Sequence, residues 1–111
     1  MKSSYFWPQN KKFAFTVFDD TDASTVQNVA PVYDFLYDLG LLTTKSVWTN
    51  LGEQAPMVVG GDTCMNPEYL EWLKSLQSRG FEIAWHNATF HSSTREDTAI
   101  GLEKLDRKSV V

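Results

Sequence analysis

The sequence predicts an α/β fold in which helices cover a parallel β-sheet and the elements follow the order β-α-β-α-β-α. Three short apolar runs, rich in β-branched and aromatic residues, have the length and composition of buried strands. Each run is followed by a stretch whose apolar residues recur with the period of a helix, and glycine ends the first two of these stretches. Strands that alternate with helices in this way pair in parallel through right-handed crossovers.

The first strand is predicted over residues 13–18, and it leads directly into a cluster of carboxylates. The run Phe-Ala-Phe-Thr-Val-Phe is typical of a strand that is covered on both faces. Asp19, Asp20 and Asp22 follow at its carboxyl end, where parallel sheets bind their ligands. Adjacent carboxylates repel each other unless a cation or a proton lies between them. We therefore interpret the cluster as part of a functional site rather than as an acidic turn.

The first helix is predicted to begin at Ser24, because Ser24 and Gln27 have the spacing of a capping box. Gly40 is the signal that ends this helix. Pro31 removes one helical hydrogen bond, so the helix either kinks there or begins nearer Asn28. The apolar stripe of the helix consists of Val26, Val29, Ala30, Val32, Tyr33, Leu36 and Leu39.

The second strand is predicted over residues 43–48, and the glycines and proline of residues 51–64 mark a loop. Asn66 is the predicted N-cap of the second helix, with proline at its first position, and Gly80 ends it. The third strand follows directly over residues 81–85.

His86 comes immediately after that third strand. Thr94 and Asp97 resemble a second capping box and indicate where the third helix begins. We assign residues 1–111 to a single domain, in which residues 1–12 form an irregular lead-in.

Composition narrows the possible classes of function. The net charge of −4 provides no basic surface for nucleic acid or for a membrane. The one cysteine, Cys64, rules out an internal disulfide. The N-terminal residues do not have the pattern of a secretory signal, so the default expectation is a cytoplasmic chain, with export left open.

Two stretches resemble the NodB-homology polysaccharide deacetylases, a family of metal-dependent carbohydrate esterases. That family carries Thr-Phe-Asp-Asp-Gly after its first strand and His-x-x-x-His after a later strand. Here residues 17–21 read Val-Phe-Asp-Asp-Thr, and residues 80–91 read Gly-Phe-Glu-Ile-Ala-Trp-His-Asn-Ala-Thr-Phe-His. The resemblance covers most of residues 13–105, and it implies that the chain corresponds to the first half of a deformed (β/α) barrel.

The resemblance implies a hydrolase that removes acetyl groups from N- or O-acetylated carbohydrate. Asp19 would be the general base, and Asp20, His86 and His91 would be the metal ligands. Two histidines and a carboxylate are a common set of zinc ligands, and cobalt, nickel or manganese are alternatives. The metal would acidify a bound water, from which Asp19 would remove a proton.

The chain departs from the family pattern at two positions. Thr21 replaces the family's glycine, and four residues rather than three separate His86 from His91. On a regular helix this spacing would place the two side chains about 140° apart, so a loop or a bulge is required if both bind one metal. The family's later motifs, including a general-acid histidine, have no counterpart in the sequence. We therefore expect the 111 residues alone to bind metal weakly, to show little or no activity and to self-associate through uncovered sheet edges.

Other classes of protein fit part of the pattern. A haloacid-dehalogenase-type phosphatase would use Asp20 and Asp22, with Asp20 as its nucleophile. A non-catalytic, receiver-like module would hold Mg²⁺ at the acidic pair, and a fragment that only packs against a partner would need no site. The phosphatase gives the two histidines no role, and a receiver needs an aspartate at the end of the third strand, where His86 stands instead. Bound zinc would favour the deacetylase, whereas binding of Mg²⁺ alone would favour the other two classes.

Overall fold

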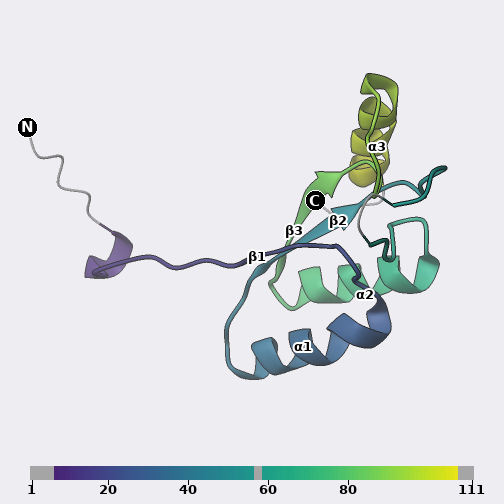
Figure 1. The fold of residues 1–111 in the computed structure, drawn as a ribbon. Helices are drawn as coiled ribbons and strands as arrows, with labels where there is room; N and C mark the ends of the chain where they lie inside the picture. Colours follow the sequence, from purple (N-terminus) through teal and green to yellow (C-terminus); the bar gives the residue numbers. More distant parts are fainter. Residues whose placement is uncertain (1–6, 57–58, 108–111) are drawn as a thin grey trace, which may run out of the picture.

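The computed structural model describes residues 7–56 and 59–107 and shows an α/β fold around a three-stranded, all-parallel sheet (Figure 1). The strands are β1 (Phe18–Asp19), β2 (Thr44–Trp48) and β3 (Glu82–Asn87). They lie in the spatial order β1-β2-β3, so β2 is the central strand. The fold class predicted from the sequence is confirmed.

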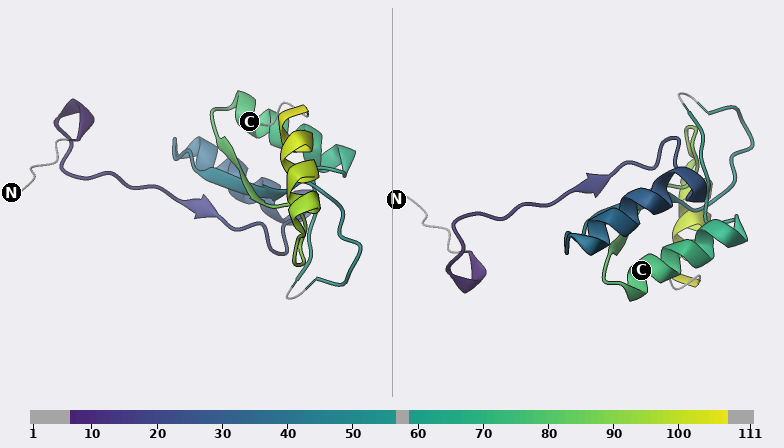
Figure 2. Two further views of the ribbon diagram at one scale, coloured as in Figure 1. Left: turned by 90° about the horizontal axis from the view of Figure 1, so that it is seen from above. Right: turned by 90° about the horizontal axis from the view of Figure 1, so that it is seen from below.

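Three α-helices follow the strands in turn: α1 (Val26–Asp38), α2 (Pro67–Ser78) and α3 (Arg95–Arg107). A short 3-10 turn, Pro8–Asn10, precedes them. Helices α1 and α2 lie side by side on one side of the sheet, and α3 lies apart from them near the carboxyl end of β3 (Figure 2). Within the described residues, no helix combines the length and the apolar character needed to span a bilayer.

The hydrophobic core forms where the apolar stripes of α1 and α2 meet β2 and β3. Every residue of β2 is buried, as expected for the central strand of a parallel sheet. The ring of Tyr33 packs edge-on against Trp72 and Phe81, with ring centroids 5.4 and 5.1 Å away. The buried core residues are Tyr33, Val47, Cys64, Tyr69, Leu73, Leu76, Phe81, Ile83 and Leu105.

The predicted strand over residues 13–18 is wrong for most of its length. Only Phe18 and the residue after it pair with β2, and the oxygen of Val17 accepts the N–H of Thr44 at 3.0 Å. Residues 11–16 extend away from the sheet as an N-terminal arm (Figure 1). Phe13, Phe15 and Phe18 are 75%, 73% and 58% exposed. Because β2 begins at Thr44, opposite Phe18, the arm has no neighbouring strand to pair with. Apolar composition alone does not make a strand without such a partner.

Helix α1 begins later than predicted, because Thr25 and not Ser24 is its N-cap. Thr25 Oγ1 accepts the N–H of Asn28 at 3.3 Å, and Asn28 Oδ1 accepts the N–H of Thr25 at 2.8 Å. The capping box therefore uses Asn28 in place of Gln27. Ser24 is buried, and its hydroxyl lies 3.0 Å from the ammonium of Lys45 instead.

The other predicted boundaries lie close to the observed ones. Pro31 lies inside α1 without ending it. Asn66 caps α2, and its side chain accepts the N–H of Glu68 at 3.0 Å. Gly80 follows α2 with φ +97°, a backbone conformation that glycine adopts without strain. The bounds of β2 and β3 differ from the predicted ones by one or two residues.

Helix α3 begins at Arg95, directly after Thr94, and the other member of the predicted capping pair, Asp97, lies in its first turn. The N–H of Thr94 donates to Asp97 Oδ2 at 2.8 Å, and the N–H of Asp97 donates to Thr94 Oγ1 at 3.1 Å. Hydrogen bonds from the Thr94 backbone and side chain lower the pKa of the Asp97 carboxyl below its ordinary value of 3.8.

We expect the N-terminus of α3 to fray in acid. Since the pKa of Asp97 is lowered in the folded state, its capping stabilises the helix above the ordinary carboxyl pKa and is lost as pH falls through the lowered value. Cα chemical shifts of residues 94–98, followed by NMR from about pH 6 to about pH 2, should move toward coil values. Asp97→Asn, which cannot titrate, should remove this pH dependence. An equal response in both proteins would contradict the assignment.

Candidate metal centre

The carboxyl edge of the sheet brings Asp20 and His86 together. Asp20 follows β1 and His86 lies in β3, so the two residues come from the outer strands on either side of β2. Their side chains meet with Oδ1 of Asp20 3.0 Å from Nε2 of His86. The parallel topology accounts for this meeting, because it places the ends of all three strands at one edge.

A β-bulge sets the direction of the His86 side chain. Val47 pairs with Trp85, and Trp48 pairs with Asn87, so β3 contains one residue more than β2 at this point. His86 is that extra residue. Bulges redirect side chains and are frequent beside functional sites. The backbone between the two histidines is thus irregular, although their rings do not converge on one point.

Asp19 faces a different group of side chains. Its Oδ2 accepts the hydroxyl of Tyr33 at 2.9 Å and lies 3.1 Å from Nζ of Lys45. Both donors bind the same oxygen, Oδ2. The second oxygen, Oδ1, has no hydrogen-bond partner among the described residues. Burial and the neighbouring Asp19 carboxylate raise the pKa of Tyr33, so the hydroxyl remains a donor at ordinary pH.

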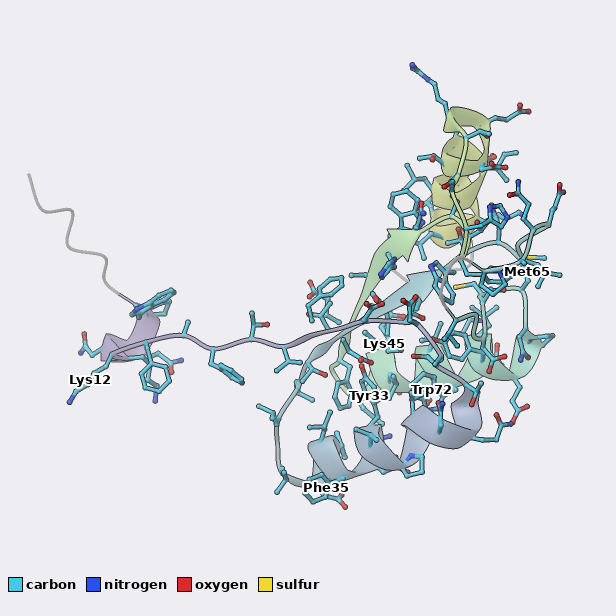
Figure 3. The ribbon with its side chains drawn as sticks, viewed as in Figure 1. Lys12, Tyr33, Phe35, Lys45, Met65 and Trp72 are labelled. Atoms are coloured by element: carbon cyan, nitrogen blue, oxygen red, sulfur yellow. The ribbon has the colours of Figure 1, made fainter. Side chains whose placement is uncertain are left out.

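Lys45 contributes to the candidate site, and the sequence analysis missed it. Its side chain is fully buried beneath the end of the arm, and its ammonium lies 3.0 Å from Ser24 Oγ and 3.4 Å from the backbone oxygen of Asp20 (Figure 3). Burial lowers the pKa of Lys45, while the Asp19 carboxylate acts in the opposite direction. The available signal was a lysine in a strand whose flanking residues are expected to be buried, since such a lysine needs an anionic partner.

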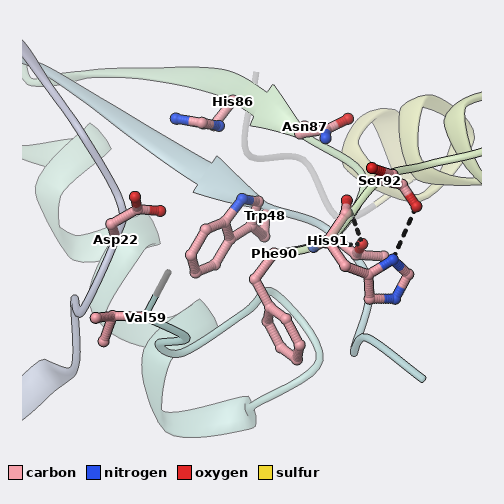
Figure 4. A pocket seen from close by; sticks show the side chains of 9 residues that line it. Asp22, Trp48, Val59, His86, Asn87, Phe90, His91 and Ser92 are labelled. Carbon is pink, nitrogen blue, oxygen red and sulfur yellow. Dashed lines mark hydrogen bonds between the residues drawn. The ribbon is translucent and has the colours of Figure 1, made fainter. Parts of the chain in front are cut away.

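His91 lies in the loop after β3, and both nitrogens of its ring already have partners, of which Figure 4 shows the contact of Nδ1 with Ser92. Nε2 accepts the backbone N–H of Glu53 at 3.1 Å, and Nδ1 lies 2.8 Å from the backbone oxygen of Ser92. Because Nε2 accepts, the ring proton lies on Nδ1 and is donated to Ser92.

His86 and His91 line one pocket of about 240 Å³, together with Asp22 and the rings of Trp48 and Phe90. In Figure 4 the ring of His91 is turned toward Ser92 and away from His86. The structure thus places both histidines at the same pocket but directs their rings differently.

The predicted ligand set is brought together only in part. Across residues 7–56 and 59–107, no three His, Cys, Asp or Glu side chains converge on a point that could hold a metal ion. Asp20 and His86 offer a carboxylate oxygen and an imidazole nitrogen, which are donors that zinc accepts. The lone pair of His91 Nε2 is occupied by the Glu53 amide. A metal could replace the proton that lies between Asp20 and His86, but as the described side chains stand it would find only these two protein ligands.

Comparisons of the chain with known protein families, with curated proteins and with solved structures find no match. The resemblance of the two motifs to polysaccharide deacetylases therefore stays a prediction from the sequence.

Proposed function

We propose that this chain forms the metal-binding part of a hydrolase that removes acetyl groups from N- or O-acetylated carbohydrate. The observation that supports the proposal most is the 3.0 Å approach of Asp20 to His86 across the central strand. A carboxylate and an imidazole at the carboxyl edge of a parallel sheet combine the position of a ligand site with the donors of a zinc site.

The same observation weighs against phosphoryl transfer. A phosphatase that uses Asp20 and Asp22, or a receiver-like module that holds Mg²⁺, gives His86 no role, and Mg²⁺ prefers oxygen ligands. Lys45 could neutralise a phosphoryl group only if it were accessible, but it is fully buried and paired with Asp19.

In this proposal Asp20 and His86 hold a divalent cation, most readily zinc. When bound, such a cation acidifies a water molecule and polarises an acetyl carbonyl. Asp19 takes up the proton of the attacking water as general base. Tyr33 and Lys45 hold Oδ2 of Asp19 and leave Oδ1 to receive that proton.

The proposal is tested by comparing two neighbouring carboxylates. Asp20→Ala should weaken zinc binding by more than roughly 100-fold, beyond the loss typical of residues outside the ligand set. Asp19→Asn, the matched control, should bind zinc as the unchanged chain does. Isothermal titration calorimetry with Zn²⁺ and with Mg²⁺ measures both affinities.

Equal losses of zinc affinity in the two variants would show that the roles of Asp19 and Asp20 are assigned wrongly. Binding of Mg²⁺ without zinc would support the phosphoryl-transfer classes instead. Any release of acetate from acetylated chito-oligomers, which we expect to be slight, should fall to background in Asp19→Asn.

A further inference from the structure

The N-terminal arm, residues 11–16, carries apolar side chains that the rest of the described chain leaves uncovered. Figures 1 and 2 show the arm reaching away from the sheet and the helices. Phe13 and Phe15 are both largely exposed to solvent. Because side chains alternate along extended backbone, Phe13, Phe15 and Val17 share one face of the arm. An exposed apolar face of this kind is typical of a surface that binds a partner.

The edge of β1 that faces away from β2 can receive a further strand. Within the described residues, β1 is an outer strand of the sheet. The oxygen of Val17 faces β2, where it accepts the N–H of Thr44 at 3.0 Å. Since the backbone groups of successive strand residues point to opposite edges, the N–H and C=O of Phe18 point to the outer edge. Such an edge is a template for the addition of a strand from another chain.

An apolar groove lies beside this edge, between β1 and α1. Its cavity has a volume of about 240 Å³, and its apolar lining comes from Val17, just before β1, and from Val29, Val32 and Leu36 of α1. Asp19 lines the same groove, so the odd-numbered side chains of the first strand are turned toward α1. A strand added at the outer edge would place every second side chain on this side of the sheet, over the groove.

Residues 11–20 are complementary in charge to a second copy of themselves. The segment begins with Lys11 and Lys12, continues as an apolar stretch, and ends with Asp19 and Asp20. Figure 3 places Lys12 at the far end of the arm. Two antiparallel copies bring the lysines of one beside the aspartates of the other, whereas two parallel copies would bring like charges together. Charge therefore favours a second copy of this chain, in antiparallel orientation, as the partner of the arm.

We propose that two copies of this chain dimerise by pairing their arms in antiparallel orientation about a twofold axis at Phe15. In this register Phe15 lies opposite Phe15 of the second copy, and Phe13 lies opposite Val17 of the second copy and covers its groove. Lys11 lies opposite Asp19. The even-numbered residues, whose backbone faces the outer edge, exchange the hydrogen bonds. The two three-stranded sheets then form one continuous sheet with an isologous interface.

Disulfide crosslinking tests the register. Phe15→Cys places two thiols directly opposite each other, where the Cα atoms of antiparallel strands lie about 4.5 Å apart, within the reach of a disulfide. This variant should form a linked dimer under mild oxidation. Thr16→Cys is the matched control: its thiols lie diagonally across the axis, with Cα atoms more than about 7 Å apart, and should not link. The unchanged chain, whose one cysteine is buried, should also stay unlinked.

Sedimentation equilibrium tests the dimer itself. Phe15→Glu should weaken it by more than roughly 100-fold, because two like charges replace two rings at the axis. Leu102→Glu, which charges an exposed apolar position on α3, should leave the dissociation constant unchanged. Both side chains are exposed in the single chain, so circular dichroism should show the same fold for both variants.

Three results would overturn the proposal. The first is an unchanged chain that stays monomeric up to about 1 mM, the weak end of measurable association. The second is a dimer that Phe15→Glu leaves intact or that Leu102→Glu weakens equally. The third is linkage of Thr16→Cys as fast as that of Phe15→Cys.

Discussion

Replacing Lys45 with methionine is expected to lower the free energy of unfolding by about 2–4 kcal/mol, because the fully buried ammonium is removed while the oxygens that it contacts stay in place. Methionine fills a similar volume, so the loss isolates the ammonium rather than a cavity. The groups left behind are Asp19 Oδ2, Ser24 Oγ and the backbone oxygen of Asp20. Urea denaturation measures the change.

Lys74 provides the matched control for this substitution. It pairs with Glu71 at 2.9 Å on the exposed surface of α2, where ion pairs contribute little. Lys74→Met should therefore change the free energy of unfolding by less than about 0.5 kcal/mol. Similar losses for the two lysines would show that the buried cluster is not a special support of the first strand.

Gly61→Ala is expected to have the second large effect, a loss of about 1–3 kcal/mol in the free energy of unfolding from overpacking. A Cβ at this position would lie 2.7 Å from the backbone oxygen and 2.9 Å from the backbone nitrogen of Ser24. The loop that contains Gly61 is also hydrogen-bonded to the turn before α1. The N–H of Ala23 donates to Gly60 O at 3.1 Å, and the N–H of Asp62 donates to Ser24 O at 2.7 Å. Since backbone cannot rotate aside as a side chain can, the loop and the turn must separate.

Gly60 provides the control, because alanine at this neighbouring position would add the same Cβ without a close contact to backbone. A Cβ at Gly60 would meet its nearest atom, Cγ of Pro56, at 3.4 Å, which is close to ordinary contact. Gly60→Ala should change the free energy of unfolding by less than about 0.5 kcal/mol. Because the displaced turn follows Asp20, Gly61→Ala should also weaken zinc binding. Thermal unfolding and calorimetry distinguish the two variants, and equal stability would contradict the predicted clash.

The parts of this fold that were predictable from the sequence depend on local chemistry. Asn66 and the following proline predict where α2 begins, and Thr94 with Asp97 predicts the cap of α3; each of these signals acts within one helical turn. The meeting of Asp20 with His86 also followed from local assignments, because parallel strands end at one edge.

The parts that were not predictable depend on partners distant in sequence. The run Phe13 to Phe18 has the composition of a buried strand, but only its last residue finds a neighbouring strand. Lys45 is explained only by Asp19, and the orientation of His91 only by the amide of Glu53. Residue type indicates which environment each of these side chains suits, but its actual contacts depend on residues that the tertiary structure brings near.

The first strand has a thermodynamic link to the site above it. Among the described residues, two residue pairs, Phe18–Thr44 and Asp19–Lys45, join β1 to β2, whereas five pairs join β2 to β3. Even with the buried contact of Lys45 to Asp19, we therefore expect the β1 edge to open at a lower free energy than the pairing of β2 with β3. A ligand bound to both Asp20 and His86 binds only the closed arrangement, and by mass action it suppresses that opening. A ligand at Asp20 and His86 would thus raise the free energy needed to open β1. Conversely, a force on the N-terminal arm that separates β1 from β2 would lower the affinity for that ligand.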